Sequence, residues 1–329
     1  YSPHQKGVLL DKGDILIEDG RIKAIEKNIK EERADKIINC QKKLVMPGLI
    51  NSHMHSDENF FRGKLDNLPL ELWMLYSCPP LNYGPFSNRI IYLRTMLGAI
   101  EMVQNGITGI QDDVSQNPAP TLDGYNSVFK AYKDIGLRAN VALNVNNKKY
   151  TTILPFTEEL IPVEIREKLD QEANSSEELI DLYEQIIDKW NNKDKLKVTL
   201  SSSAPQRCTD KHLQRLWDLS EKYDLPLHTH VLETKVQRVS GTEFYGKTII
   251  EHLNDLGLLN KRLSINHSVW VDYNDMKLMA DNKVTVIHNP ISNLKLGSGI
   301  MPFIDMYNKG INITLGTDGT SSNDSLNMF

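Results

Sequence analysis

Histidines gather at the ends of short apolar segments that are far apart in the chain. Six of the nine histidines occupy such positions, and an aspartate ends the last segment: His53, His55, His228, His230, His267, His288 and Asp318. Imidazole nitrogens and carboxylate oxygens are donors that zinc and other divalent transition metals take in proteins. Histidines kept for packing alone would not all end apolar segments, so the pattern predicts a metal site.

His53 and His55 are separated by one residue, so in an extended chain both side chains point to the same side and can reach one cation. This motif alone is weak evidence, because a lone histidine is often a hydrogen-bonded core residue. Because further histidines and an aspartate end later segments, a metal site is a better interpretation than a hydrogen-bonded core histidine. A divalent ion would lower the pKa of a bound water to about 7 and so supply hydroxide as a nucleophile.

These residues need a scaffold that brings distant segments to one point. Short β-branched segments recur, each followed by a polar stretch or an amphipathic helix, as in parallel β/α units. We expect eight strands, at residues 44–55, 106–113, 136–143, 196–203, 225–231, 262–269, 283–290 and 311–319. Eight such repeats predict an α/β fold, a (β/α)8 TIM-type barrel, whose strand ends meet at one mouth that hosts the active site.

The beginning of the chain has a different pattern. Short apolar runs flank Asp19 and Gly20, a dipeptide that closes hairpins between strands, and residues 36–47 are expected to form one more strand. We therefore expect residues 1–47 to contribute the N-terminal strands of a small domain. Residues 48–329 are expected to form the barrel.

Two segments near the middle of the barrel region have sequence patterns that predict their local structure. Ser175 and Glu178 have the spacing of a capping box, which predicts that a helix begins there. The preceding stretch, from about Asn144 to Asn174, is long and charged and contains Pro155. We expect a loop with short helices over the barrel mouth, where loops often serve as lids.

Composition excludes several other classes of function. The chain has 329 residues, with 38 Lys and Arg against 43 Asp and Glu, and the formal net charge of −5 disfavours nucleic-acid binding. No stretch approaches the roughly 18 to 20 apolar residues of a membrane helix, and the first residues lack a signal peptide's apolar core. We expect a cytoplasmic protein with a small-molecule partner and no nucleic-acid or membrane partner; a homo-oligomer stays open.

The three cysteines, Cys40, Cys78 and Cys208, are widely separated. They form neither a disulfide framework nor the close pair of a structural zinc site, so we expect core thiols.

Five segments carry a resemblance to a known family: PGLINSHMH, HTHVLET, INHSVW, IHNPISNLKLGSG and LGTDGTSSND. In this order and spacing they resemble the metal-dependent amidohydrolase superfamily, in its branch of aminohydrolases and chlorohydrolases that act on purines, pterins and triazines. Within the branch they are most similar to S-adenosylhomocysteine or methylthioadenosine deaminases. The resemblance implies a (β/α)8 barrel and a β-sandwich built from both chain ends, so the C-terminal part of the fold is expected beyond Phe329.

The resemblance also implies one divalent metal ion, with zinc as the default and iron or manganese as alternatives. Its ligands would be His53, His55, His230 and Asp318. His228, one step earlier on the same side of its strand, would support the site, or would replace His230 as a ligand. A second metal is not expected, because the residues that end the fourth barrel strand include no lysine and Lys197 comes too early to reach the mouth.

Three residues would then share the proton transfers. Asp318 can accept a proton from the water, and Glu233 can protonate the ring nitrogen next to the attacked carbon. The position of His267 in the resemblance suggests that it polarises the hydroxide or helps to move a proton to the leaving ammonia.

Trp73, Gln206 and Ser322 are the candidate substrate-binding residues. Trp73 could stack on a planar ring or anchor a loop, Gln206 could bond a ring edge, and Ser322 could bond a ring substituent or cap a turn. Gln206 stands where the deaminases usually carry a histidine, and the segment from Ser77 to Pro80 replaces one that supplies a glutamate to the ribose end. Both departures weaken the case for a ribose-bearing substrate.

Other polar residues at the mouth keep two interpretations each. His288 supports the site or packs beside it, and Asp112 and Asp113 either hydrogen-bond the ligands or cap the next helix.

The sequence thus predicts a metal-dependent aminohydrolase that deaminates an amino-substituted purine, pterin, pyrimidine or triazine ring and releases ammonia. Hydrolytic removal of chloride or an alkylamine from a similar ring is the alternative, since the same residues would serve it. A non-catalytic barrel is a distant third hypothesis, because all four ligands and both acid/base candidates are present.

Overall fold

The computed structural model describes residues 12–30, 33–77, 85–116, 119–170 and 173–329. The chain divides into two compact units, one that ends at Gly48 and one that spans Leu49–Phe329. None of the described helices is long and apolar enough to cross a membrane.

The first unit contains an antiparallel hairpin. Strands β1 (Asp14–Glu18) and β2 (Arg21–Glu26) pair with each other, and the turn residues Asp19 and Gly20 have φ values of 51° and 70°. Positive φ at both central residues is what a tight hairpin turn of this kind requires, which is why an Asp-Gly pair predicts it correctly.

Residues 36–47 of this unit are not a strand, and that prediction was wrong. Among the described residues of the unit, none lies beside this segment to complete a backbone ladder, and its apolar side chains, such as Ile38 and Leu44, are exposed. Cys40 is exposed as well, which corrects its assignment to a core; Cys208 is buried as expected, and Cys78 lies outside the described residues. The β-sandwich stays a prediction.

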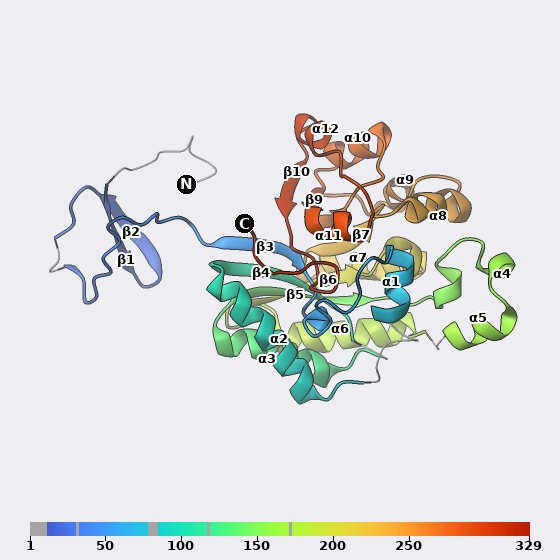
Figure 1. The fold of residues 1–329 in the computed structure, drawn as a ribbon, viewed down its shortest axis with the longest axis horizontal. Helices are drawn as coiled ribbons and strands as arrows, with labels where there is room; N and C mark the ends of the chain where they lie inside the picture. Colours follow the sequence, from blue (N-terminus) through green and yellow to red (C-terminus); the bar gives the residue numbers. More distant parts are fainter. Residues whose placement is uncertain (1–11, 31–32, 78–84, 117–118, 171–172) are drawn as a thin grey trace. The chain divides into compact units, whose positions relative to one another are not determined.

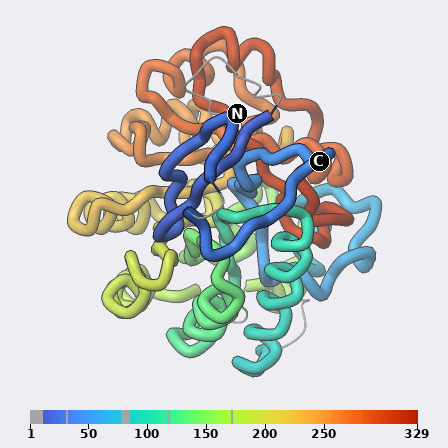
Figure 2. Tube along the Cα trace, turned by 90° about the vertical axis from the view of Figure 1, so that its left-hand side faces the viewer, coloured from blue at the N-terminus to red at the C-terminus, as the bar shows by residue number. Residues whose placement is uncertain are grey.

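The second unit is the predicted barrel. Its strands form one eight-stranded sheet in sequence order, and every neighbouring pair is parallel: β3 (Leu49–Met54), β4 (Ile107–Val114), β5 (Arg138–Val145), β6 (Leu196–Ser202), β7 (Leu227–Val231), β8 (Leu263–His267), β9 (Thr285–His288) and β10 (Asn312–Leu315). Figure 2 shows the elements following one another around the barrel in chain order. The (β/α)8 fold is therefore confirmed.

The seam between the first and last strands is closed by a few specific bonds. The Asp318 amide donates to the His53 carbonyl at 3.0 Å, and the Thr317 amide donates to Asn51 Oδ1 at 3.1 Å. Asp318 itself lies beyond the end of β10, because the strand predicted to run to residue 319 ends at Leu315. The seam thus runs through residues next to the mouth.

Helices cover the outside of the sheet, as Figure 1 shows for α2, α3 and α6 beside β4, β5 and β6. The helices are α1 (Leu70–Ser77), α2 (Asn88–Gln104), α3 (Leu122–Ile135), α4 (Thr157–Leu160), α5 (Val163–Leu169), α6 (Ser176–Trp190), α7 (Asp210–Tyr223), α8 (Lys235–Tyr245), α9 (Ile249–Asp255), α10 (Tyr273–Asp281), α11 (Pro290–Lys295) and α12 (Phe303–Asn308). The capping box of Ser175 and Glu178 opens α6 as predicted. The stretch before it holds α4 and α5, so the expectation of a loop with short helices is confirmed.

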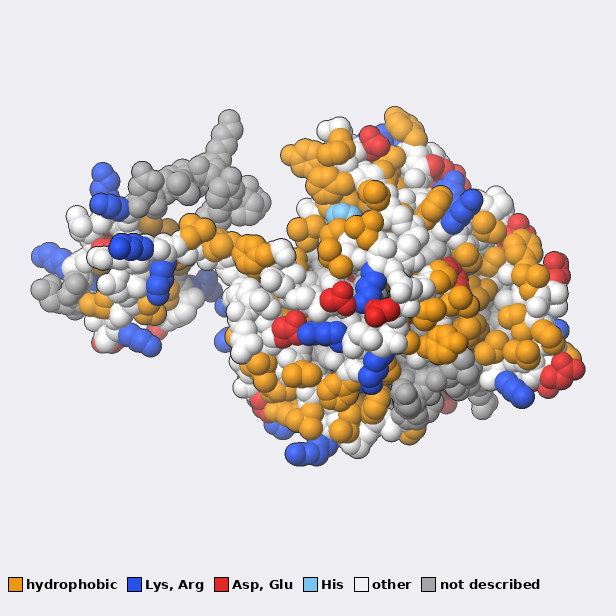
Figure 3. All heavy atoms as spheres, in the orientation of Figure 1, with side chains coloured by type: hydrophobic (Ala, Val, Ile, Leu, Met, Phe, Trp, Pro, Cys, Tyr) orange, Lys and Arg blue, Asp and Glu red, His pale blue; other side chains and the backbone are white. Residues whose placement is uncertain are grey.

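The main core fills the space between sheet and helices with aliphatic strand residues and buried aromatic residues of α3 and α6, such as Phe129 and Tyr183. A smaller apolar cluster joins three separate segments at the barrel mouth: Leu70, Trp73, Met74, Ile153 and Leu296. Exposed apolar side chains gather over α11 and α12 in Figure 3, among them Ile291, Leu294, Phe303, Ile304 and Tyr307.

Candidate active site

Four predicted metal ligands meet at the carboxyl ends of the barrel strands. His53 lies in β3 and His230 in β7, where alternation of side chains along a strand turns both inward. The Nε2 atoms of His53 and His55 lie 3.2 Å and 3.3 Å from Asp318 Oδ1. The Nε2 atoms of His230 and His55 are 3.3 Å apart. Three imidazoles and one carboxylate thus point at a common centre, and all four residues are buried.

The contacts of Nδ1 in His55 and His230 show why the Nε2 atom of each imidazole can bind a metal ion. His55 Nδ1 faces the Asp113 carbonyl, and His230 Nδ1 lies 2.7 Å from the Ser203 carbonyl. A carbonyl oxygen only accepts, so each Nδ1 carries the hydrogen and each Nε2 keeps a lone pair. His53 Nε2 is buried without a hydrogen-bond partner among the described residues. A divalent cation fits this donor set, since it would satisfy the free lone pairs.

The electrostatics of the cluster favour a cation. Burial lowers the pKa of His53 to about 4, so this imidazole stays neutral. Burial opposes ionisation of Asp318, but His53 and His55 outweigh it and hold the pKa of that carboxyl well below its usual range. Burial alone would lower the pKa of His55, yet Asp318 and Glu58 raise it, so His55 favours the protonated form when no ion is bound, and a metal ion would displace that proton. Neutral imidazoles and an ionised carboxylate are the forms that bind metals.

His267 and Glu233 lie on one side of this cluster. His267 Nε2 is 3.6 Å from Glu233 Oε2 and 3.9 Å from Asp318 Oδ2, so the imidazole stands between the two carboxyl groups. Its Nδ1 lies 2.8 Å from Asn293 Oδ1, and its Nε2 has no hydrogen-bond partner in the described part of the chain. Burial raises the pKa of Glu233, which favours the protonated acid.

The backbone is strained at two of these positions. His267 has a φ of 70° and Asp318 a φ of 63°, and both values lie in the left-handed region of backbone conformation that residues other than glycine rarely adopt. Such conformations persist only where the surrounding structure enforces them, and they concentrate at functional sites. The folded barrel therefore holds both residues in place at a cost in conformational energy.

Two residues that the sequence analysis did not assign touch this centre. Ser292 donates to Asp318 Oδ2, and Glu58 accepts from the amide and hydroxyl of Ser321. Burial raises the pKa of Glu58 to about 8. A Cβ at Gly319 would collide with the Glu58 carboxylate, so this turn admits only glycine without rearrangement. Ser292 stands in the segment IHNPISN, which did signal the mouth; Glu58 had no such signal beyond its closeness to His55.

The open interpretations resolve as follows. His228 Nε2 lies 2.9 Å from His53 Nδ1, behind that imidazole and not among the converging Nε2 atoms. His288 is half-buried with its ring 6.2 Å from that of Phe303, which is the packing interpretation. Asp112 accepts from the Ser56 amide and the Tyr132 hydroxyl and does not cap the next helix, α3, whose N-cap is Thr121. Asp113 Oδ2 lies 3.8 Å from His230 Nδ1, which favours its interpretation as a neighbour of the ligands.

The candidate substrate-binding residues differ in what they offer. Trp73 is 8% exposed and packs in the small apolar cluster at the mouth, which is its anchoring interpretation, although its Nε1 has no described partner. Gln206 is 3% exposed, and its Oε1 is likewise free of any described partner. Ser322 donates to the Gly319 carbonyl at 3.2 Å, so its hydroxyl stabilises the turn. Of the segment Ser77 to Pro80, only Ser77 is described.

Arg207, which the sequence analysis passed over, also reaches this region. Its guanidinium donates to Ser203 Oγ at 2.8 Å and lies against the sulfur of Met74, and its charge acts on Glu233 by lowering the pKa that burial raises. No carboxylate of the described residues forms a salt bridge with it.

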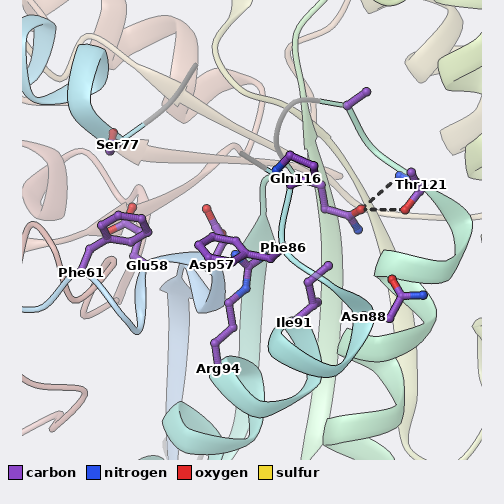
Figure 4. A pocket seen from close by; sticks show the side chains of 12 residues that line it. Asp57, Glu58, Phe61, Ser77, Phe86, Asn88, Ile91, Arg94, Gln116 and Thr121 are labelled. Atoms are coloured by element: carbon purple, nitrogen blue, oxygen red, sulfur yellow. Dashed lines mark hydrogen bonds between the residues drawn. The ribbon is translucent and has the colours of Figure 1, made fainter. Parts of the chain in front are cut away.

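A cavity of about 350 Å³ lies between the segment after β3, the start of α2 and the segment before α3. Figure 4 shows Glu58 and Phe61 on one side of it, Arg94 and Ile91 rising from α2, and Gln116 near Thr121. Arg94 is 4% exposed, and its guanidinium lies 5.4 Å from the centre of the Phe86 ring. Because Glu58 borders both this cavity and the turn that carries Asp318, the cavity adjoins the site.

Fold and site together define a metal-binding barrel hydrolase, and comparison with known proteins gives the family. Residues 44–329 match the Amidohydrolase family, and the chain belongs to it. A 5'-deoxyadenosine deaminase from Methanococcus aeolicus is 34% identical over 322 residues, which cover 96% of this chain and 68% of that protein. A 5-methylthioadenosine/S-adenosylhomocysteine deaminase from Pyrococcus furiosus is 31% identical over 318 residues, covering 97% and 69%. The chain is a hydrolase that acts on carbon–nitrogen bonds.

Solved structures agree with the barrel. An adenosine deaminase from Xanthomonas campestris with bound zinc has a TM-score of 0.78 and 24% identity, covering 98% of this chain and 67% of that one. A guanine deaminase from C. acetobutylicum with bound guanine has a TM-score of 0.80 and 22% identity, covering 96% and 71%. At this identity the likeness establishes the fold.

Proposed function

We propose that the protein is a mononuclear metal-dependent aminohydrolase that deaminates an amino-substituted nitrogen heteroaromatic ring and releases ammonia. The observation that carries the proposal is a buried cluster in which the Nε2 atoms of His53 and His55 face Asp318 Oδ1 and His230 Nε2 lies 3.3 Å from His55 Nε2, with Glu233 and His267 on one side of the cluster. The curated relatives named as deaminases of adenosine derivatives support the reaction class.

The metal would be held by His53, His55, His230 and Asp318. Three nitrogen donors and one oxygen donor suit zinc, and a relative in fold was solved with zinc; iron and manganese accept similar donors. When bound, the ion would acidify a water molecule, so that it can attack the ring near neutral pH.

The protein's own residues would then move the protons. Asp318 takes one from the attacking water, and Glu233, kept protonated by burial, donates one to the ring nitrogen beside the attacked carbon. His267 stands between both carboxyl groups and can pass the proton from Asp318 to the amino group. The carbon–nitrogen bond breaks, ammonia leaves, and Glu233 regains its proton as the ring carbonyl forms.

We propose a purine, pterin, pyrimidine or triazine as the ring. The Oε1 atom of buried Gln206 has no described hydrogen-bond partner, which supports a contact to a ring edge. Trp73 would offer a flat apolar surface to the ring once its neighbours in the small apolar cluster move aside. Ser322 contributes least, because its hydroxyl is engaged by a backbone carbonyl.

The test measures release of ammonia, chloride and alkylamine by zinc-loaded protein across aminopurines, adenosine derivatives, pterins, cytosine and amino-, chloro- and alkylamino-substituted triazines. We expect turnover of one ring class, about 10²- to 10⁴-fold slower in Glu233→Gln, because that variant cannot donate the proton. The matched control is Glu243→Gln, an exposed residue of α8, which should match the unmodified protein. Chloride or alkylamine release without ammonia would replace the proposal by the alternative leaving group. Equal activity in Glu233→Gln would refute the acid role, and failure to bind a metal would refute the mechanism.

A further inference from the structure

The three histidines of the cluster are not oriented in the same way. His55 and His230 direct Nδ1 to backbone carbonyls, which can only accept a hydrogen bond. His53 directs Nδ1 to a side chain instead, the Nε2 of His228 at 2.9 Å. An imidazole nitrogen is either donor or acceptor, so the hydrogen of His53 is placed correctly only if His228 Nε2 accepts.

Ser264 decides the state of His228. The Ser264 hydroxyl donates to the Leu227 carbonyl at 3.0 Å, which uses its one hydrogen. Ser264 Oγ lies 2.8 Å from His228 Nδ1, so it must accept there, and His228 carries its hydrogen on Nδ1. His228 Nε2 is therefore an acceptor, because a neutral imidazole carries one hydrogen.

Asn266 gives the same result independently. Its Nδ2 lies 2.8 Å from His228 Nε2 and also donates to the Thr229 carbonyl at 3.4 Å, so the amide nitrogen, and not the oxygen, faces the imidazole. A donor on this side again requires a lone pair on His228 Nε2, and His53 Nδ1 and Asn266 Nδ2 share that one lone pair.

We infer that Ser264 and His228 are positioning residues that keep the hydrogen of His53 on Nδ1 and leave His53 Nε2 free to bind the metal. The inference rests on the proposed metal site. Ser264 reaches His53 only through His228, so a hydroxyl two hydrogen bonds away controls a metal ligand. Partners of this kind typically contribute 10- to 100-fold to metal affinity.

The test measures zinc affinity of the full chain by competition with a chromophoric chelator, together with thermal unfolding of the metal-free protein. Ser264→Ala should weaken zinc binding about 10-fold, because one of the two groups that keep the hydrogen of His228 on Nδ1 is lost, and the double variant Ser264→Ala/Asn266→Leu, which removes both groups, should weaken it about 100-fold. The control is Ser220→Ala, a buried serine of α7 that donates to the Leu225 carbonyl in the same way; its zinc affinity should not change.

Variants of His228 separate positioning from packing. His228→Gln offers an amide oxygen to His53 and an amide nitrogen to Ser264, and should retain most of the affinity, whereas His228→Leu should lose it. The visible spectrum of the cobalt-substituted protein should change in Ser264→Ala and stay the same in Ser220→Ala.

Unchanged zinc affinity in Ser264→Ala would overturn the inference, and so would an equal loss in Ser220→Ala or in both His228 variants. If His228→Leu does not fold, Ser264→Ala and His228→Gln still decide. Failure of the unmodified protein to bind about one zinc per chain would instead overturn the proposed function.

Discussion

His55 and His230 each direct Nδ1 to a backbone carbonyl, while His55 Nε2 faces Asp318 and His230 Nε2 lies 3.3 Å from His55 Nε2. Asp318 is itself held by Ser292 and by the amide of Gly319, which donates to Oδ1 at 2.9 Å. Each candidate ligand therefore has a neighbour that sets its orientation before any ion binds, which reduces the rearrangement on binding.

A substitution at Gly319 tests whether this arrangement tolerates one added carbon atom. Gly319→Ala adds a Cβ that would collide with Glu58, so either Glu58 or the turn with Asp318 must move. We expect a loss of about 1–3 kcal/mol in the free energy of unfolding, measured in urea, and weaker zinc binding.

Gly109→Ala in β4 is the matched control, because a Cβ there meets only Ile50 at 3.8 Å, an ordinary contact. Equal stability and zinc affinity in the two variants would show that the turn tolerates the methyl group.

Short elements, rather than the long barrel helices, hold the acid and base candidates. Within α11, Ser292 bonds Asp318 and Asn293 bonds His267, so one turn of helix orients residues from two different strand ends. In another short element, Asp170 accepts from the amide and hydroxyl of Thr151 at 2.9 Å and 2.7 Å, and so ties the end of α5 to the loop after β5. This tie bears on the predicted lid.

Asp170→Ala should loosen that loop without weakening the barrel, because it removes both bonds but no core contact. We expect limited proteolysis within residues 144–174 to become several-fold faster, while the thermal midpoint of the barrel stays nearly constant.

Asp181→Ala, on the exposed side of α6, serves as the control. A cleavage pattern that is identical in both variants would mean that Asp170 does not restrain the loop.

Local patterns predicted the elements well, because they depend on neighbours in sequence. The Asp-Gly hairpin, the capping box at Ser175 and the eight β/α repeats each have a periodic or short-range signal. The strand expected at 36–47 failed because pairing depends on a partner strand that composition cannot supply. The contacts of Ser264 and Glu58 were beyond prediction, since they join segments that only the closed barrel brings together.

At the scale of the whole molecule, the proposed metal site lies at the barrel seam. Asn51 and Thr317, whose side chains bond at 2.7 Å, are 266 positions apart in the sequence, and the ligands His53 and Asp318 lie beside them. An ion that binds His53, His55, His230 and Asp318 would therefore connect the first barrel strand to the last.

Removal of the metal should lower the thermal stability of the protein. A ligand present at 100 to 1,000 times its dissociation constant stabilises by about 2.7 to 4.1 kcal/mol, and this stabilisation should disappear with a chelator and return with zinc. Differential scanning calorimetry of Asp318→Asn provides the comparison, since its midpoint should not respond to either addition. If the midpoint of the unmodified protein responded to neither addition, the folded protein would not bind the ion at all, and the proposed site would be refuted.

The same location sets an order of events during synthesis. His53 and His55 leave the ribosome early, but Asp318 follows only after more than 260 further residues, so the complete site cannot exist on a partly made chain. Metal binding at the proposed site would then be a late step that follows the pairing of the first and last barrel strands, so a bound ion would indicate that the last strand has reached the first.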